Sequence, residues 1–285
     1  MAFETASKAV SFMGSNLKLL RFAGGEPLTD FSLFLRIMEI LPPSTQVRLT
    51  TNGLLLKDAI LDRLESDGRI SLVLSVDGKR ATHTSHRRPA NSAGDSYSWF
   101  EEFAHRLSRF SRPVTMNVVI SPGEAHNLVE NIAFLASKGF YRFNLLPAYF
   151  CHWQQDQLAD LQKQLRLLAA FFDQGLRKGI PFSVVNVEHY SAQPLFTDSL
   201  VVDIDGSLFD NDIIVSHFFS KDKKTYSLGN ILTDASLNSA FLETGKTNWP
   251  ALIEEKLPPD IVRSTQQVDN ELNLFVGRLQ CIFKD

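Results

Sequence analysis

FAGGEPL at residues 22–28 lies where a strand-like apolar run gives way to a helical pattern, and its interpretation decides the fold. Gly24 and Gly25 carry no Cβ, so a ligand can lie directly against the backbone N–H and C=O groups there. Glu26 adds a carboxylate suited to an ammonium group, and Pro27 fixes φ and supports the turn. Taken alone, the run is equally consistent with an ordinary strand-to-helix turn, so the rest of the chain must decide between the two interpretations.

Outward from this turn, apolar runs alternate with amphipathic segments of helical length, which is the pattern of β/α units around a parallel sheet. The expected strands are 17–23, 47–51, 71–76, 114–120 and 143–147, and the expected helices are 30–41, 55–66, 96–109, 124–138 and 154–178. A helical segment at 5–13 comes before the first of these strands. Because a barrel helix follows a strand, we expect an α/β fold, a partial (β/α)6 TIM-like barrel that lacks its first strand.

The pattern changes after residue 180. The segment SLVVDIDGSLFDNDIIV at 199–215 predicts two short strands around an Asp-Gly turn rather than another β/α unit. We therefore expect two parts, the partial barrel over 1–180 and a small α+β C-terminal extension over 181–285.

Two further strand ends carry polar residues. TTNG at 50–53 ends the second expected strand, and SVDG at 75–78 ends the third. Ligands of β/α barrels bind at the carboxyl ends of the strands. Three consecutive strand ends therefore favour a ligand site over an ordinary turn.

The series FAGGEPL, LTTNGLLL and LSVDGKRATHTSHRR resembles the radical S-adenosylmethionine (SAM) superfamily. It is most similar to members with a SPASM or twitch extension, such as anaerobic sulfatase maturases and peptide-modifying enzymes. The resemblance runs from about residue 3 to 150 and more weakly to 232, where TYSLGNI at 225–231 resembles an element of the extension. It implies a lineage that cleaves SAM to a 5′-deoxyadenosyl radical for peptide or protein modification.

The resemblance also implies roles for individual residues. It places the amino group of the SAM methionine at the glycine turn and the SAM ribose beside the third strand end. The cofactor-binding candidates that follow are Gly24, Gly25, Glu26, Pro27, Asn52, Ser75, Asp77 and Asn117.

The segment HTSHRR at 83–88 resembles the His-Asp-x-x-Arg segment of the family, with Thr84 in place of the Asp. His83 and one of Arg87 and Arg88 are therefore further candidates. The alternative is a loop histidine on a solvated face, followed by a surface pair of arginines.

Family members hold a 4Fe–4S cluster with a Cys-x-x-x-Cys-x-x-Cys loop, which this chain lacks. Its two cysteines, Cys151 and Cys281, cannot supply three thiolate ligands. Asp210, Asn211 and Asp212 stand where the extension would carry a thiolate, so we expect no auxiliary cluster. SAM remains a possible cofactor, and three explanations stay open: a fragment, a split gene whose separate chain supplies the cluster loop, and an inactive pseudoenzyme.

The amino-acid composition limits the classes of partner that the chain is expected to bind. With 29 basic and 32 acidic residues and a net charge of −3, the chain has no general attraction for nucleic acid. No run approaches the roughly 20 apolar residues of a membrane span, and no targeting signal precedes the first helix. We expect a cytoplasmic protein, outside the membrane, that acts on a peptide or protein.

Two other functions stay open. One is a non-catalytic SAM- or peptide-binding module, and the other is an unrelated β/α-barrel hydrolase or lyase that uses Glu26 and Asp77 as acid and base. The strand at 17–23 is expected to lie at an open sheet edge, which predicts low solubility or self-association.

Overall fold

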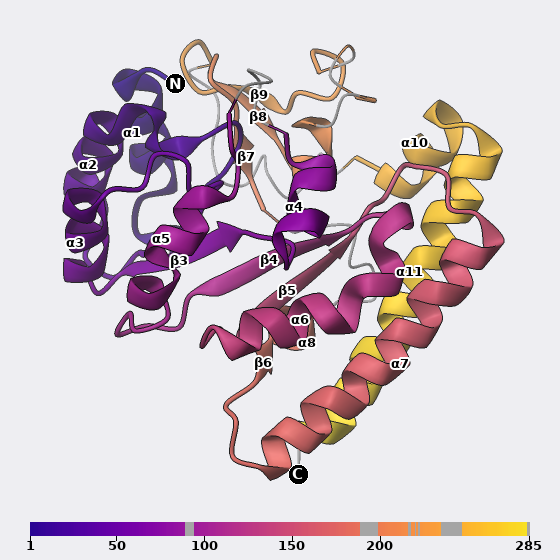
Figure 1. Ribbon diagram of the computed structural model, residues 1–285. Helices are drawn as coiled ribbons and strands as arrows, with labels where there is room; N and C mark the ends of the chain where they lie inside the picture. The colour runs from indigo at the N-terminus through magenta and orange to yellow at the C-terminus, as the bar shows by residue number, and fades with distance from the viewer. Residues whose placement is uncertain are drawn as a thin grey trace. The chain divides into compact units, whose positions relative to one another are not determined.

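The computed structural model describes residues 1–88, 94–188, 199–215, 218–219, 221, 223–234 and 247–283. The elements follow the order labelled in Figure 1. The chain forms two compact units, and each unit combines two chain segments. The first unit contains Met1–Val47 and Gln193–Pro258, and the second contains Arg48–Ala192 and Pro259–Asp285. A domain boundary near residue 180 stays a prediction.

The first unit begins with a helix, a strand and a second helix, as the sequence pattern predicts. These are α1 (Phe3–Met13), β1 (Leu19–Phe22) and α2 (Phe31–Ile40), with short 3-10 turns at Gly14–Asn16 and Pro27–Asp30. The buried residues of α1 recur at helical spacing, and α1 packs against α2. Arg36 of α2 lies over the Phe3 ring, 3.9 Å from its centroid.

The expected hairpin is present in the same unit. β7 (Val201–Val202) pairs antiparallel with β8 (Ser207–Phe209), and β9 (Gly229–Asn230) adds a third strand. Gly206 takes a φ of +87° at the turn, a conformation that favours glycine. A 3-10 turn at Asp212–Val215 and helix α10 (Trp249–Lys256) complete the described part of this segment.

The second unit contains most of the β/α repeats. Its strands are β3 (Ile70–Ser75), β4 (Thr115–Ile120), β5 (Arg142–Pro147) and β6 (Ser183–Val184), preceded by β2 (Gln46–Thr51), which begins in the first unit. Its helices are α3 (Asp58–Ser66), α4 (Arg80–His86), α5 (Ser98–Leu107), α6 (Leu128–Ser137), α7 (Gln155–Arg177), α8 (Val185–Glu188) and α11 (Pro259–Ile282). The six strands form one parallel sheet in the order β1-β2-β3-β4-β5-β6. The predicted α/β class is therefore confirmed.

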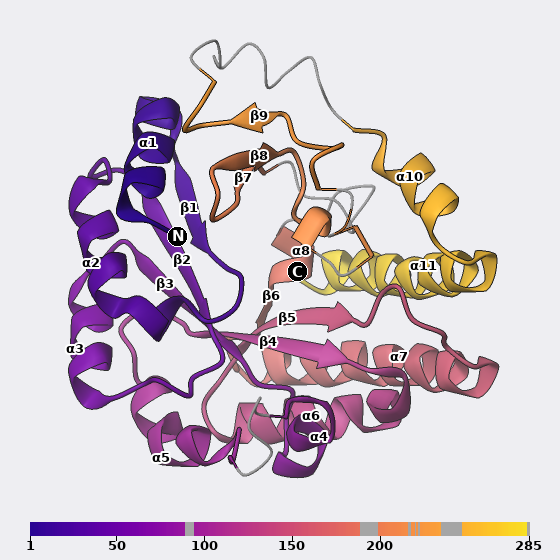
Figure 2. The ribbon, with the colours of Figure 1, turned by 90° about the horizontal axis from the view of Figure 1, so that it is seen from above.

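Alternation along the strands gives the sheet of the second unit two different faces. Phe143 of β5 packs on Phe172 of α7, with ring centroids 6.0 Å apart, and helices α6 and α7 run along this side of β4 and β5 (Figure 2). Neighbouring residues on a strand point to opposite faces. Asn144 and Asn117 are half-buried and therefore belong to the face opposite these helices.

Helix α11 is a feature that the sequence pattern did not single out. It packs along α7 and holds the loop that follows β5. The backbone N–H of Trp153 donates to Ser264 Oγ at 2.8 Å, and Tyr149 Oη donates to Asp269 Oδ1 at 3.1 Å. Within this loop Phe150 takes a φ of 59°, which is unusual for a residue with a side chain.

Among the helices of the described residues, none combines the length and the apolar character needed to cross a lipid bilayer.

Candidate functional site

The glycine turn that follows β1 is open. Gly24, with a φ of +96°, needs the conformational freedom of glycine, whereas Gly25 does not have a positive φ. A Cβ placed on either residue would meet no described atom within 4 Å. Neither crowding nor conformation therefore explains why residue 25 is a glycine, and the backbone there is accessible to a ligand.

Glu26 has a structural role in the same turn. Its Oε1 accepts a hydrogen bond from the backbone N–H of Leu28 at 3.0 Å and so caps the 3-10 turn that begins at Pro27. The Glu26 side chain is half-buried. Gly24, Gly25, Glu26 and Pro27 therefore lie together, as the motif predicts, with a carboxylate beside exposed glycine backbone.

The second strand end, after β2, is held by its own side chains. Thr51 Oγ1 accepts from the Gly53 N–H at 3.0 Å, and Asn52 Oδ1 accepts from the Leu54 N–H at 3.0 Å. Gly53 is buried with a φ of +82°, and a Cβ there would lie 2.2 Å from the Trp99 ring. This glycine is explained by packing, in contrast to Gly25.

Asp77, at the third strand end, is the centre of a buried polar cluster. Its side chain is fully buried, and Arg87 donates to both carboxylate oxygens. His86 Nε2 lies 3.0 Å from Oδ2, and the Val119 N–H donates to Oδ1 at 2.8 Å. Burial alone would raise the pKa of Asp77, but the bonds from His86 and Arg87 outweigh it and lower that pKa.

The interpretation of His83 as a solvated loop residue is wrong. His83 lies on α4 with only 2% of its surface exposed, and its ring is 5.2 Å from the Tyr97 ring. Burial lowers its pKa to about 4, so the ring is neutral at physiological pH. Its Nδ1 has no hydrogen-bond partner among the described residues and lies 3.7 Å from Asp77 Oδ2.

The two arginines of this segment also differ from each other. Arg87 is half-buried against Asp77, so the interpretation of a surface arginine pair is wrong for it, whereas Arg88 is exposed. Arg87 supplies the cation that the buried Asp77 carboxylate needs. With Arg87 and His86 bound to its oxygens, Asp77 is poorly placed to bind a ligand directly.

Ser75, Asn117 and Asn144 form a polar row across β3, β4 and β5. The strand register aligns Ser75 with Asn117, and Asn117 with Asn144. Asn144 Nδ2 donates to Asn117 Oδ1 at 2.9 Å. The structure thus places Ser75 beside Asn117 and adds Asn144. The signal for Asn144 in the sequence was its alternation with the apolar Phe143 and Leu145.

The chain's thiols do not fit a 4Fe–4S cluster. Cys151 is half-buried, its Sγ donates to the Ala148 carbonyl at 3.3 Å, and burial raises the pKa of this thiol. Cys281 is exposed on α11. Two thiols, one of them held in its protonated form, are not a three-thiolate donor set. Over the described ranges, no group of three or more His, Cys, Asp or Glu side chains is arranged to hold a metal ion.

The acidic residues of the hairpin have structural partners. Asp210 accepts hydrogen bonds from the Thr247 N–H at 2.7 Å and from Trp249 Nε1 at 3.0 Å. Asn211 is buried and accepts from the Ile213 N–H at 2.9 Å, whereas Asp212 is exposed. The bonds of Asp210 therefore join the end of the hairpin to the start of α10, whereas Asn211 bonds locally.

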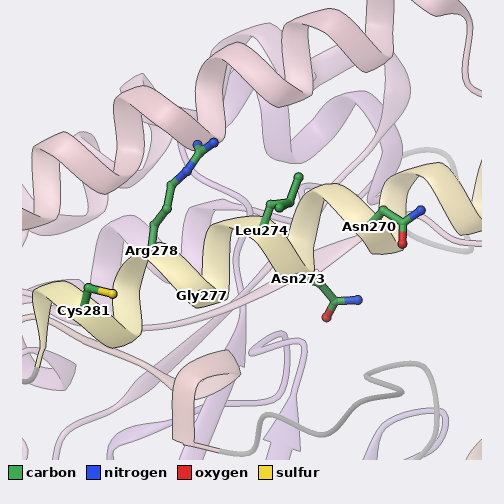
Figure 3. A pocket seen from close by; sticks show the side chains of 6 residues that line it. All are labelled: Asn270, Asn273, Leu274, Gly277, Arg278 and Cys281. Atoms are coloured by element: carbon green, nitrogen blue, oxygen red, sulfur yellow. The ribbon is translucent and has the colours of Figure 1, made fainter.

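A pocket of about 670 Å³ lies on α11, and none of the predicted cofactor-binding residues lines it. In Figure 3, Leu274 and Arg278 point to one side of the helix and Asn273 points to the other. Its lining residues come from one helix and do not converge on a common point: Asn270, Asn273, Leu274, Gly277, Arg278 and Cys281.

Solved structures supply the comparison. No protein-family model matches the sequence. No curated protein matches it either. The structure is similar to the anaerobic sulfatase-maturing enzyme anSMEcpe with bound AdoMet, with a TM-score of 0.75 and 16% identity over 100% of this chain and 91% of that chain.

Two other solved structures agree with this likeness. The complex of anSMEcpe with AdoMet and the Kp18Cys peptide gives a TM-score of 0.73 at 16% identity, over 100% of this chain and 91% of that one. Streptococcus suis SuiB bound to S-adenosylmethionine gives 0.59 at 14% identity, over 87% of this chain and 58% of that one.

The fold is therefore that of the radical SAM peptide- and protein-modifying enzymes. The predicted resemblance to this superfamily is confirmed at the level of the fold, and the two neighbours that carry it are anSMEcpe and SuiB.

Proposed function

We propose that this chain binds SAM, with the methionine part of the ligand at the turn formed by Gly24, Gly25, Glu26 and Pro27. The observation that carries the proposal is Gly25, whose glycine identity neither a positive φ nor a neighbouring atom of the described residues explains. Exposed backbone N–H and C=O groups beside the Glu26 carboxylate suit a zwitterionic α-amino acid. The anSMEcpe and SuiB structures with bound SAM support this assignment.

We infer that Asn52, Ser75 and Asn117, in the second unit, are also SAM-binding residues. Asp77 then acts as a support for the third strand end, because its oxygens are occupied by Arg87 and His86. This occupancy gives no support to a hydrolase or lyase that uses Asp77 as acid or base.

The proposed function is binding without SAM cleavage by this chain alone. SAM supplies a sulfonium group whose reductive cleavage needs an electron from an iron-sulfur cluster. The two thiols of this chain do not form the required donor set, so the non-catalytic binding module is the form of the function that we favour. Reconstitution with iron and sulfide tests this inference, and a bound 4Fe–4S cluster detected by visible absorbance would overturn it.

Calorimetry with SAM tests the binding site. Glu26→Gln keeps an oxygen that can cap the turn at Leu28 but removes the charge, whereas Glu26→Ala removes both. We expect Glu26→Gln to weaken SAM binding about tenfold or more with little change in stability, since a charge-assisted bond contributes about 1.5–3 kcal/mol. Wild-type protein that binds no SAM, or a Glu26→Gln variant that binds it unchanged, contradicts the proposal.

We also propose a peptide or protein as the partner and the cytoplasm as the location. The support for the partner class comes from the neighbours, because anSMEcpe has been solved with two peptides and SuiB with its precursor peptide SuiA. Fluorescence anisotropy with a panel of labelled peptides, in the presence and absence of SAM, checks the partner class.

A further inference from the structure

The face of the sheet that carries Ser75, Asn117 and Asn144 contains a second polar row one step earlier along the strands. In that row Arg142 donates to Thr115 Oγ1 at 3.2 Å, to Ser183 Oγ at 3.3 Å and to Glu188 Oε2 at 2.6 Å. The Arg142 row is therefore saturated by contacts within the protein and holds β4, β5, β6 and α8 together.

The row of Ser75, Asn117 and Asn144 is different, because the one side-chain hydrogen bond that it makes among the described residues joins the two asparagines. Within the described residues, Ser75 Oγ, Asn117 Nδ2 and Asn144 Oδ1 have no protein partner. All three residues are half-buried, on the sheet face opposite α6 and α7. Among the described residues, the row of Ser75, Asn117 and Asn144 therefore has donors and acceptors left for a ligand, whereas the Arg142 side chain bonds to residues of the protein.

The bond between the asparagines fixes which groups are presented. Because Asn144 donates its Nδ2 to Asn117 Oδ1, the Asn117 amide must present its Nδ2 as the free donor. Asn144 in turn presents its Oδ1 as an acceptor. Residues in register on adjacent strands lie about 5 Å apart, so a donor and an acceptor stand side by side.

We propose that Asn144 is a positioning residue that orients the Asn117 amide, and that the resulting donor–acceptor pair reads the 6-aminopurine edge of SAM. Adenine presents an acceptor at N1 beside a donor at N6, which is the pattern complementary to Asn117 Nδ2 and Asn144 Oδ1. The inference rests on the proposed SAM-binding function and adds to it the residue that sets base specificity.

The test compares Asn144→Asp with Asn117→Asp. An aspartate at 117 still accepts the bond from Asn144, whereas an aspartate at 144 cannot donate, so the Asn117 amide must turn to donate its Nδ2 to residue 144. Asn144→Asp then presents two acceptors in place of a donor and an acceptor. Circular dichroism and melting curves of both variants serve as controls for folding.

Binding is measured by calorimetry with SAM and with the S-inosyl analogue, whose base reverses the donor and the acceptor. Wild-type protein is expected to bind SAM about tenfold more tightly than the analogue, and Asn144→Asp to reduce that ratio toward about one. A purely structural role would lower both affinities together and leave their ratio unchanged, which would overturn the proposal.

Side-chain amide NMR signals of Asn117, recorded without ligand, provide a second readout. We expect Asn144→Asp to shift the Asn117 NH₂ signals and Asn117→Asp to leave the Asn144 signals hydrogen-bonded. Unchanged Asn117 signals would overturn the orienting role. Wild-type protein that binds no SAM would instead refute the proposed function and the base assignment, while the NMR result still decides whether Asn144 orients Asn117.

Discussion

Gly25 and Gly53 both follow strands of the sheet, yet they are glycines for different physical reasons. At Gly53 a side chain is excluded by the φ of +82° and by the Trp99 ring, which would lie 2.2 Å from an added Cβ. At Gly25 an added Cβ would meet no atom of the described segments within 4 Å, and φ is not positive. Gly53 is therefore explained by packing against Trp99, whereas Gly25 leaves its backbone accessible.

Alanine at these two positions should separate the two reasons. Gly53→Ala is expected to destabilise the protein by about 3 kcal/mol, because the added Cβ overlaps Trp99 and the backbone is strained. Gly25→Ala is expected to change stability by less than about 0.5 kcal/mol while weakening SAM binding about tenfold. Urea denaturation and calorimetry measure the two effects. A Gly25→Ala variant with full SAM affinity would show that the open backbone is not a binding surface.

His83 carries a second prediction at this scale, which concerns pH. Burial lowers its folded-state pKa from the ordinary 6.5 to about 4, so in that interval the unfolded chain binds a proton that the folded protein does not. The contribution of neutral His83 to the free energy of unfolding is therefore fully present above about pH 6.5. It is lost as the pH drops toward 4, by about 3 kcal/mol in total.

Neutral variants of His83 test this sign. His83→Phe and His83→Gln should flatten the dependence of the unfolding free energy on pH between 6.5 and 4, whatever their stability at neutral pH. Denaturation curves at several pH values make the measurement, and His105→Gln, on the exposed face of α5, serves as the control. An unchanged slope in both His83 variants would contradict the assignment.

At the scale of secondary-structure elements, the Asp77 cluster connects strand β3, helix α4 and strand β4. Asp77 lies just after β3. Its carboxylate contacts His86, the last residue of α4, and Arg87, which follows α4, and it accepts a hydrogen bond from the Val119 N–H of β4. A fully buried carboxylate needs such partners, because losing its counter-ion leaves an uncompensated charge. The cluster thereby fixes where β3 ends relative to β4.

Arg87→Met is therefore expected to destabilise the protein by about 2 kcal/mol or more. The double variant Asp77→Asn, Arg87→Met should recover part of this loss, because the amide removes the buried charge and keeps an oxygen for the Val119 N–H. Thermal and urea denaturation of the two single variants and the double variant give the coupling energy. Additive effects would mean that the two side chains do not act as a pair.

Most elements could be predicted from sequence because their apolar residues repeat at the spacing of a strand or a helix. Helix α7 matches the predicted 154–178 segment within one residue at each end. Helix α11 has comparable amphipathic spacing, but nothing in the sequence shows that it packs on α7 and holds Tyr149, 120 positions earlier. Contacts between distant segments, such as the pairing of Asn117 with Asn144, depend on strand register, which the sequence alone does not provide.

For the whole molecule, the order of elements and motifs along the chain was the strongest evidence for the fold. The alternation of apolar runs with amphipathic segments predicted the α/β class, and three strand ends with polar turns in succession predicted the radical SAM fold. The likeness to anSMEcpe confirms both. The glycine turn belongs to the first compact unit and the polar row to the second. Burial inside α4 was not predictable, because HTSHRR is polar throughout and shows no apolar periodicity.

The strand order also supports a prediction about assembly. β1 stands at the end of the sheet, with β2 as its neighbouring strand among the described residues, and none of its four residues is fully buried. Leu19 is 44% exposed there. An edge strand with exposed apolar side chains is a template for pairing with another chain. We therefore expect the protein to self-associate as its concentration rises.

Light scattering over a range of concentrations should show the mean mass increasing, and Leu19→Lys should suppress the increase because a charge at the edge opposes strand pairing. Leu167→Lys provides the matched control, since Leu167 is similarly exposed, at 48%, but lies on α7. Association that both variants suppress equally would point to general apolar stickiness rather than to the edge. Wild-type protein that stays monomeric at high concentration would contradict this prediction. It would mean that another segment of the same chain covers the outer edge of β1.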